Sequence, residues 1–475
     1  MASTRQKGER LVLGVSFWPT GATSSGWRAQ AADNSGVFNP DALARAARKA
    51  ESGVLDYFFL GNSYFSDGSQ PGSVIRRAFQ LNGFAAANYL AGQTRHIGLV
   101  ATVNSTLLEP FHVAQLAVST AHLSQGRFGL NIVTGAGNDP SYRNFSLPEH
   151  PGNADRYTRA REFAGVLVGL QDSWDADWLV NDKAGGRLLH EQAHHAIDFR
   201  GQHFQVAGPL NAPPPPAGRI PLVFAGTSEE SIRFGAQFAD IRFSPFVNTG
   251  WNQRWYRAVK QAVAAAGRNP DDHKVISGTV FYAGETTAEA RALFREVEAG
   301  VVEGFGPDLI AKTFGVPRES ITPHGRVLDV LRLGDDGDTY GIASNDRHAI
   351  GAFDISLDLR EVIEAYGSED ITFVDLFRFL TNRAHFPVIV GDKKRIADWI
   401  ESNFHDHAFD GVKFFPPYQF GPFERFVDLV VPELQRRGLA RTHYDTSTLR
   451  GHLGLATRAA VPAPATSSAT QGTPA

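Results

Sequence analysis

The string H-E-Q-A-H at residues 190–194 is a stretch whose residue types and spacing could support catalysis. Two imidazoles with a carboxylate between them form the zinc signature of many metalloproteases when they lie on one helix. Such a site also needs a third protein ligand and an open position for water. Here no third ligand is defined, and residues 196–208 alternate as a β-hairpin would. We therefore interpret the string as a surface or lid loop, and keep a zinc hydrolase built on His190, Glu191 and His194 as the alternative.

A second group of candidates joins a predicted strand, 220–226, to a predicted helix, 228–239. Gly226, Thr227 and Ser228 lie at this junction. Free N–H groups at a helix N-terminus, together with hydroxyl donors, form a ready phosphate site. Ser228 would serve equally well as an ordinary helix cap. The two roles are compatible, because a capping segment can also bind a phosphate.

Short apolar strands alternate with helices along the chain, which is typical of parallel βαβ units. The predicted strands are 10–17, 55–61, 96–103, 127–135, 220–226, 240–246, 273–284 and 410–417. The predicted helices are 40–53, 75–92, 110–126, 154–171, 228–239, 251–267, 286–300, 392–405 and 423–438. This count predicts an α/β fold, a (β/α)8 TIM barrel. A doubly wound open sheet is the alternative, but no predicted strand leads into a complete G-x-G-x-x-G.

The length of the chain exceeds what a minimal barrel requires. We predict a single barrel domain over residues 1–458, followed by a disordered tail of Ala, Pro, Ser and Thr at 459–475. The excess lies in predicted insertions near 62–75, 136–153, 172–219 and 301–391. Insertions at the carboxyl-terminal face of a barrel build substrate pockets and lids.

Composition narrows the class of protein. Of the 475 residues, 42% are hydrophobic and 20% charged, with a formal net charge of -4 and no block of Lys and Arg. A large core is therefore expected, and a nucleic-acid partner is not. The absence of cysteine excludes disulfides, thiolate zinc sites and cysteine nucleophiles. The polar start of the chain and the lack of a long apolar run predict a cytoplasmic protein without a membrane partner.

Several longer segments together carry a family resemblance. The most informative are "LDYFFLGNS" (55–63), "HIGLVATVNSTLLEPFHVAQLAVSTAHLSQGRFGLNIVTG" (96–135), "RYTRAREF" (156–163), "FRGQHFQVAGPL" (199–210), "VFAGTSEES" (223–231), "DGVKFFPP" (410–417) and "TLRGHLGL" (448–455). In this combination the chain resembles the flavin-dependent monooxygenases related to bacterial luciferase. The branch is that of nitrilotriacetate monooxygenase, dibenzothiophene sulfone monooxygenase and the pristinamycin synthase. The family has an insertion and no metal where the H-E-Q-A-H string lies.

The resemblance implies a two-component enzyme. A separate NAD(P)H-dependent flavin reductase would supply reduced FMN, and a flavin peroxide formed with dioxygen would oxygenate the substrate. Phenylalanine-rich strand ends favour a small hydrophobic substrate, aromatic or heteroatom-containing, so that C–S, C–N or C–halogen cleavage would fit. The resemblance implies a homodimer or a homotetramer, and leaves open whether the flavin reacts through its C4a or its N5 position.

The resemblance also implies roles for five polar residues. Thr102 and Asn131 would be catalytic, facing the oxygen-reacting edge of the flavin, and Thr102 would also bind it. Asn62 would lie beside the flavin ring, where the family usually has Asp. Asn153 stands where relatives often have His, and Tyr157 matches a tyrosine that reaches the FMN phosphate or ribityl chain. Ordinary strand-end and turn roles remain open for these residues, as does a flavin-binding barrel without catalysis.

Overall fold

The protein was analysed as a computed structural model, which describes most of the chain. The described residues are 5, 9–37, 39–66, 79–135, 139–226, 228–244, 249–301, 304–333, 340–341, 356–357, 359–383 and 386–456. The predicted disordered tail at 459–475 and the predicted site residue Thr227 lie outside them.

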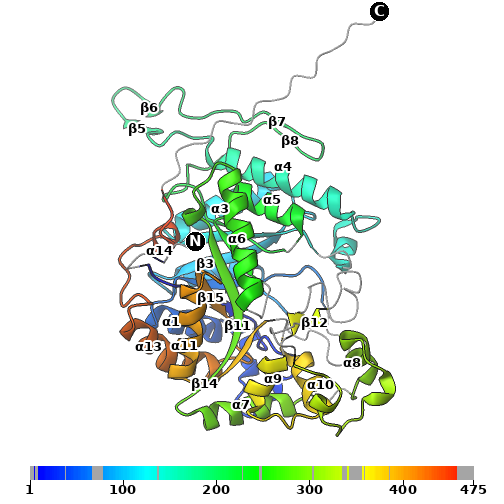
Figure 1. The fold of residues 1–475 in the computed structure, drawn as a ribbon. Coiled ribbons are helices and arrows are strands. Elements are labelled where there is room, and N and C mark those ends of the chain that lie inside the picture. The colour runs from blue at the N-terminus through cyan, green and yellow to red at the C-terminus, as the bar shows by residue number, and fades with distance from the viewer. Residues whose placement is uncertain are drawn as a thin grey trace, which may run out of the picture.

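A closed ring of parallel strands forms the centre of the fold (Figure 1). In spatial order the strands are β10 (Ile241–Ser244), β9 (Leu222–Phe224), β4 (Phe128–Val133), β3 (Gly98–Asn104), β2 (Tyr57–Leu60), β1 (Val12–Phe17), β15 (Gly411–Phe414) and β11 (Lys274–Gly284). A direct pairing of β10 with β11 closes the ring. These are the strands that the sequence predicts, and the TIM-barrel prediction is confirmed.

The long strand β11 also recruits a strand that the sequence pattern does not predict. Its first half pairs with β10 and β15, and its second half, from Val280, pairs in parallel with β14 (Val388–Asp392). Only the first half belongs to the barrel. The second half therefore extends the sheet beyond the closed ring.

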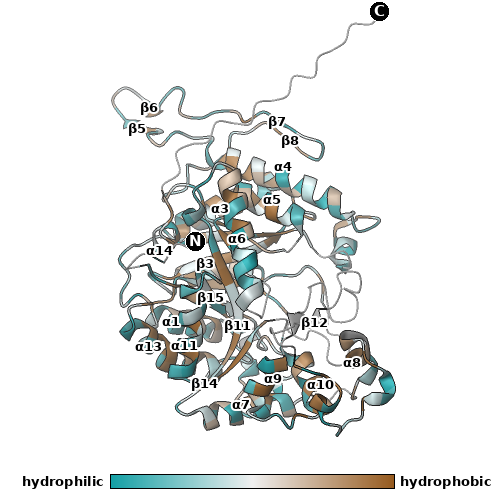
Figure 2. Cartoon of the chain, viewed as in Figure 1, coloured by the Kyte–Doolittle hydropathy of each residue, from teal (hydrophilic) through white to brown (hydrophobic). Residues whose placement is uncertain are grey.

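Helices surround the barrel on its outside. They are α1 (Pro40–Ser52), α2 (Gly83–Ala91), α3 (Pro110–Leu123), α4 (Asn153–Gln171), α5 (Glu229–Phe238), α6 (Thr249–Ala265), α7 (Thr287–Ala299), α11 (Lys393–His405), α12 (Gly421–Arg425) and α13 (Val431–Arg436). In Figure 2 the central strands β11 and β14 are largely hydrophobic, whereas α11 and α13 also carry hydrophilic residues. This distribution is expected for helices that bury one face against a sheet.

One helix begins later than the sequence predicts. The predicted helix 75–92 starts only at Gly83, because the Asn82 side chain accepts hydrogen bonds from the backbone N–H groups of Phe84 and Ala85. Asn is among the strongest helix N-caps, since its side chain satisfies donors that the first turn leaves free. The described residues before Asn82 are not helical, so that part of the prediction is wrong.

Side chains fill the inside of the barrel, and a short helix closes its amino-terminal end. Inward-facing residues such as Val100, Val223 and Ile276 pack in one cluster with Leu449 of helix α14 (Leu449–His452) and with Leu453, which follows that helix. Gly98 and Gly129 admit the Leu449 side chain, because a Cβ at either position would lie 2.6 Å from it. The amino-terminal end is therefore packed, which leaves the carboxyl-terminal end as the mouth of the barrel.

Two further groups of elements lie outside the barrel. Helices α8 (Pro307–Phe314), α9 (Leu359–Tyr366) and α10 (Phe373–Asn382) share a hydrophobic core with α7. Two antiparallel ribbons, β5 (Leu179–Asp182) with β6 (Arg187–Leu189) and β7 (Phe199–Arg200) with β8 (Gln205–Val206), lie above α4 in Figure 1. The β7–β8 pair confirms the predicted hairpin. A two-residue pairing joins β12 (Tyr340–Gly341) to β13 (Ser356–Leu357).

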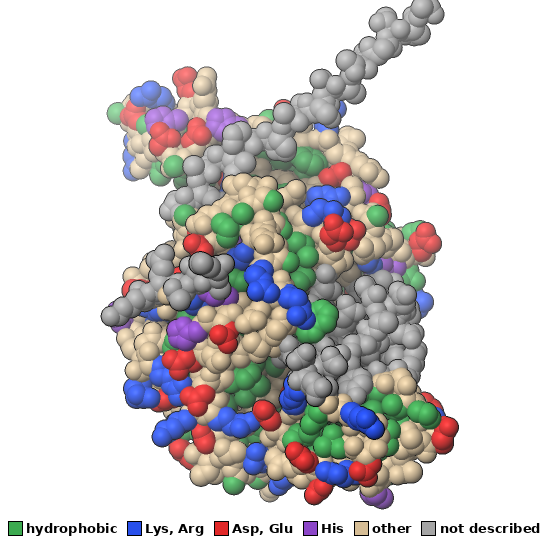
Figure 3. Space-filling model, in the orientation of Figure 1, with side chains coloured by type: hydrophobic (Ala, Val, Ile, Leu, Met, Phe, Trp, Pro, Cys, Tyr) green, Lys and Arg blue, Asp and Glu red, His purple; other side chains and the backbone are tan. Residues whose placement is uncertain are grey.

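Acidic and basic side chains are interspersed over the face of the molecule in Figure 3. Within the described part of the chain, no helix is long and apolar enough to cross a membrane.

Candidate functional site at the mouth of the barrel

Thr102 and Asn131 lie side by side in adjacent strands, β3 and β4, and both are buried. The Asn131 amide Nδ2 donates to Thr102 Oγ1 at 3.1 Å, and this hydroxyl donates to the carbonyl oxygen of Leu60 at 3.0 Å. The single O–H of Thr102 is therefore used within the protein. Asn131 keeps one N–H, and its Oδ1 has no hydrogen-bond partner among the described residues. Since buried polar atoms are nearly always paired, Asn131 is the member of this pair suited to contact a ligand.

Asn62 lies just beyond β2 and interacts with a tyrosine two positions later. The Tyr64 hydroxyl is in contact with the Asn62 side chain and the backbone of Asn104. Burial raises the pKa of Tyr64 to about 12, so this tyrosine stays protonated near neutral pH. Asn144 donates to the Tyr64 carbonyl oxygen at 2.7 Å, and the Phe145 ring packs edge-on against the Tyr64 ring. The Asn62 loop is thus attached to the segment that follows β4.

A buried arginine organises the start of helix α4. Arg156 donates to Asn153 Oδ1 at 3.0 Å, and its other terminal nitrogen lies 3.0 Å from His150 Nδ1. Only 6% of Arg156 is exposed, and its Nε has no partner among the described residues. Burial lowers the pKa of both Arg156 and His150. The exposed Asn153 is therefore held by Arg156, whose buried guanidinium still has a donor available.

Tyr157, the next residue along α4, lies beside the loop that follows β9. Its hydroxyl lies 3.2 Å from where a Cβ of Gly226 would be, and Ser231 Oγ lies 2.5 Å from the same point. Gly226 also has a φ of +133°, which favours glycine. Arg242, which is fully buried, donates to the Gly226 carbonyl oxygen at 2.7 Å and to the Ser231 carbonyl oxygen at 2.8 Å. Arg242 thus fixes the shape of this loop and adds positive charge close to Tyr157.

Ser228 caps helix α5 as the sequence predicts, since its Oγ accepts from the Ser231 backbone N–H at 3.2 Å. The carboxylate of Glu230, in the first turn, interacts with the Ser228 side chain and with its own backbone N–H. These hydrogen bonds lower the pKa of Glu230. The Glu230 carboxylate therefore occupies donors that an incoming anion would otherwise use.

Aromatic side chains form one wall near the mouth. Trp18 follows β1, and its ring lies 2.8 Å from where a Cβ of Gly61, just after β2, would be. On the β15 side, the rings of Phe386 and Phe415 stack with centroids 3.9 Å apart. A Cβ at Gly278 of β11 would likewise lie too close to both of these rings. This wall gives the mouth an apolar side next to the polar residues of β3 and β4.

The H-E-Q-A-H string does not adopt the helix that a zinc site requires. His190 and Glu191 are exposed in a turn after β6. The His194 ring stacks on Trp174 at 5.1 Å, and His195 Nε2 lies 2.9 Å from an Asp175 carboxylate oxygen. No cluster of three or more candidate metal ligands occurs in the part of the chain that the structure describes. His190 and His194 therefore do not come together as ligands of one metal ion.

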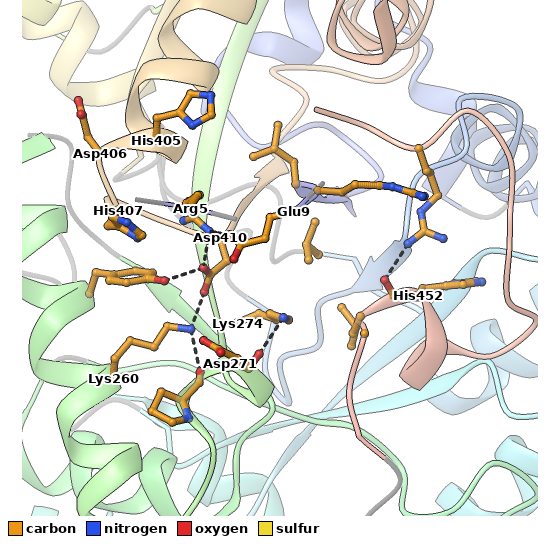
Figure 4. A pocket seen from close by; sticks show the side chains of 18 of the residues that line it. Arg5, Glu9, Lys260, Asp271, Lys274, His405, Asp406, His407, Asp410 and His452 are labelled. Carbon is orange, nitrogen blue, oxygen red and sulfur yellow. Dashed lines mark hydrogen bonds and ion pairs between the residues drawn. The ribbon is translucent and has the colours of Figure 1, made fainter. Parts of the chain in front are cut away.

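A cleft of about 970 Å³ opens at the opposite end of the barrel (Figure 4). Its central acid is Asp410, which accepts from the Tyr256 hydroxyl at 2.8 Å and pairs with Lys260 at 3.0 Å and Arg5 at 3.2 Å. Burial alone would raise the pKa of Asp410, but Lys260 and Arg5 hold it below its ordinary value. None of the predicted site residues lines this cleft. Because barrel enzymes act at the carboxyl-terminal face, we do not assign catalysis to it.

The sequence-predicted residues thus fall into two neighbouring groups on the carboxyl-terminal side. Asn62 follows β2, Thr102 and Asn131 lie on the next two strands, β3 and β4, and Tyr157 lies beside Gly226. His150 and Arg242 were missed, because their importance depends on partners that are distant in the sequence. A charged residue inside a short apolar strand, as in "DIRFS", is the signal that could have identified Arg242.

Comparison with known protein families gives one clear match. Residues 21–410 match the family model described as luciferase-like monooxygenase.

Individual relatives cover almost the whole chain. Nitrilotriacetate monooxygenase component A of Aminobacter aminovorans is 34% identical over 458 residues, covering 94% of this chain and 97% of that protein. Dibenzothiophene-sulfone monooxygenase of Rhodococcus erythropolis is 32% identical over 417 residues, covering 86% and 88%. Among solved structures, EDTA monooxygenase of Chelativorans sp. BNC1 is similar with a TM-score of 0.75 and 26% identity, covering 94% of this chain and 99% of that one.

Proposed function

The chain belongs to the luciferase-like monooxygenase family and is a flavin-dependent monooxygenase, and from this premise we propose that it is the oxygenating component of a two-component system using reduced FMN and dioxygen. The proposal is carried by the incompletely satisfied polar groups at the mouth of the barrel, above all Asn131 Oδ1. A cofactor site needs such groups. None of the predicted site residues lies at the packed amino-terminal end of the barrel.

The residues of β3 and β4 fit the ring end of a flavin. An isoalloxazine ring has both N–H donors and carbonyl acceptors on its edge. Asn131 has one free N–H and one free oxygen, so it can serve either kind of group. Thr102 orients the Asn131 amide by accepting its other N–H.

The phosphate end of the proposed site has the right charge. Tyr157 lies close enough to two buried arginines, Arg156 and Arg242, to interact electrostatically with both. Arg156 Nε remains available, and Gly226 keeps the adjacent loop free of a side chain. Guanidinium groups are well suited to phosphate oxygens. For the phosphate also to reach the N-terminus of α5, we expect the Glu230 carboxylate to move aside.

When bound and reduced, the flavin would supply the electrons that activate dioxygen. Asn131 would then hold the reacting edge of the ring with preorganised hydrogen bonds, which is among the larger contributions that a protein makes to catalysis. Trp18 and the Phe386–Phe415 pair would exclude water from the same space. Asn62 would contact the ring through its amide and could not act as an acid or base.

We propose a small hydrophobic substrate, aromatic or heteroatom-containing. The aromatic wall supports this choice, as does the similarity to a dibenzothiophene-sulfone monooxygenase. The relative named for nitrilotriacetate is slightly more similar, at 34% identity against 32%, and a polycarboxylate substrate is the competing possibility.

We also propose a separate NAD(P)H-dependent flavin reductase as the partner. The name of one relative, component A, supports an enzyme of more than one component. A cytoplasmic location and a homodimer or homotetramer remain predictions from the sequence.

Anaerobic titration of the protein with reduced FMN, followed by mixing with oxygenated buffer, tests the proposal. Saturable binding and a delayed return of the oxidised flavin spectrum are expected. Absence of binding, or reoxidation as fast as that of free flavin, would refute it.

A further inference from the structure

A single lysine lies inside the barrel. Lys413 is on β15 between Gly14 of β1 and Gly278 of β11, and only 3% of it is exposed. Its side chain points inward, because the Nζ atom lies 3.8 Å from the ring centroid of Phe59 on β2 and 3.4 Å from that of Phe243 on β10. The amine therefore lies near the middle of the barrel, where bulky aliphatic side chains are the rule.

Among the residues that the structure describes, no anion balances this lysine. Within the described part of the chain, the contacts of Nζ are the faces of Phe59, Phe243 and, at 4.7 Å, Phe415. The strand residues next to it on β1 and β11 are glycines, and no acidic or basic group acts on it. Burial alone lowers the pKa of Lys413 well below its ordinary value.

This arrangement is costly. A buried ammonium without a counter-ion loses several kcal/mol of hydration, and three aromatic faces restore only part of it. An aliphatic residue of similar length would fill the same space without that penalty. The structure of the barrel alone therefore gives no reason for a lysine at this position.

Lys413 lies across the interior of the barrel from Asn131, because β15 and β4 are on opposite sides of the closed ring. The Phe59 ring that it contacts belongs to a residue level with Val100 on β3. Thr102 follows Val100 by two residues, whereas on the other side of the barrel Phe243 follows by two residues Ile241, which is level with Val223 and Asn131. The Lys413 amine, which contacts both rings, is therefore at about the depth of Asn131 and on the order of 10 Å from it across the narrow interior of an eight-stranded barrel.

We propose, on the basis of the flavin site proposed above, that Lys413 is a positioning residue that favours anionic reduced flavin over neutral oxidised flavin. Reduced flavin readily loses its N1 proton and then carries a negative charge on the ring. When this anion binds, it favours protonation of the Lys413 amine from solvent, and the protonated amine is the missing counter-charge. At such a separation, in a partly buried environment, attraction between unit charges strengthens binding roughly tenfold.

The proposal fits the task of a component that receives its flavin from elsewhere. An enzyme supplied with reduced FMN must bind that form and release the oxidised form after the reaction. A charge that acts on only one of the two forms achieves this without any contact to the flavin.

The test uses Lys413→Met, which keeps the length and apolar stem of the side chain but removes the amine. Dissociation constants for reduced and oxidised FMN are measured anaerobically at pH 8 and 9, where reduced FMN is already anionic. In the unmodified protein we expect a preference for the reduced form that weakens as pH rises, because Lys413 must be protonated for the attraction. In Lys413→Met we expect this preference to fall about tenfold and its pH dependence to disappear, with little change for oxidised FMN.

Two controls separate charge from structure. Lys274→Met removes one positive charge at the amino-terminal cleft and should leave the preference unchanged. Lys413→Leu repeats the experiment if Lys413→Met does not fold, as judged by thermal unfolding. Calorimetry in buffers of different ionisation enthalpy should show net uptake of a fraction of a proton by the unmodified protein, at most about half for a tenfold coupling, and none by either Lys413 variant.

Equal weakening of both flavin forms in Lys413→Met, or no change in either, would overturn the proposal and leave Lys413 as a packing residue. Failure of the unmodified protein to bind FMN in any form would instead refute the proposed function. The two failures are therefore distinguishable.

Discussion

The buried polar groups described at the two ends of the barrel differ in whether they have partners. At the amino-terminal end, Asp410 is surrounded by Arg5, Lys260 and the Tyr256 hydroxyl, and each group has a partner. At the mouth, Asn131 Oδ1 and Arg156 Nε have none among the described residues. Saturated groups hold a structure together, whereas buried groups left without partners need another explanation, such as a ligand.

The same contrast separates two lysines. Lys260 donates to the carbonyl oxygens of Pro270 and His273 and pairs with Asp410, whereas Lys413 lies over aromatic rings and has no ion pair with any described residue. We therefore expect substitutions at the amino-terminal end to change stability, and substitutions at the mouth to change flavin binding and reactivity.

The largest expected effect is on stability. Asp410→Asn removes the charge that Arg5 and Lys260 share, and should lower the free energy of unfolding by about 3–5 kcal/mol. FMN affinity should stay within about twofold, because the mouth is untouched. Chemical denaturation measures the first quantity and flavin titration the second.

The pH dependence provides a check on this prediction. The pKa of Asp410 is lower in the folded protein than its ordinary value, so its contribution is present above that ordinary value and is lost as pH falls through the folded one. Stability that falls less steeply in acid in Asp410→Asn than in the unmodified protein would agree. Identical acid profiles would show that Asp410 does not hold this end together.

Asn131→Ala should have the next largest effect, and it should act on reactivity. The variant loses both free groups at the mouth, so the delay in flavin reoxidation should shorten about 100-fold in stopped-flow absorbance. Thr102→Val removes only the group that orients Asn131. Its delay in flavin reoxidation should therefore lie between those of Asn131→Ala and the unmodified protein. An unchanged delay in Asn131→Ala would mean that this pair does not face the reacting flavin.

Arg156→Gln should weaken FMN binding roughly tenfold or more, because a charge-assisted hydrogen bond is worth about 1.5–3 kcal/mol. Riboflavin, which has no phosphate, serves as the matched ligand and should bind both proteins alike. Equal losses for FMN and riboflavin would place the role of Arg156 in folding of the α4 start rather than in phosphate binding.

The smallest expected effect is a gain in FMN affinity. Glu230→Gln removes the carboxylate that competes at the N-terminus of α5, so FMN should bind tighter by a factor of about two to five, the range of exposed charge effects. The effect should shrink in high salt, because exposed charges are screened. Weaker binding in Glu230→Gln would show that the phosphate does not reach this helix.

Most of the fold could be predicted from local patterns. Each barrel strand is a short apolar run followed by a helix, and that alternation is visible in the sequence. Strand β14 could not be predicted, because it pairs only with the second half of β11, and this extension beyond the barrel depends on tertiary structure. The start of α2 was missed because the Asn82 cap outweighed the helical pattern that precedes it.

The candidate site was predictable where it follows strand ends and family motifs, as for Thr102, Asn131 and Tyr157. The site could not be predicted where the role of a residue depends on the lack of a hydrogen-bond or ion-pair partner in the fold. Lys413 in "GVKFF" and Arg242 in "DIRFS" look alike in the sequence. Only the structure shows that Arg242 bonds to Gly226 and Ser231, while no acidic group of the described residues acts on Lys413.

An experimental structure of the protein with FMN tests the central claim most directly, because it decides which end of the barrel takes the flavin. The account predicts the ring against Asn131 at the mouth and the phosphate beside Arg156 and Tyr157. Flavin bound instead in the amino-terminal cleft, with its phosphate near Lys260 and Lys274, would contradict it.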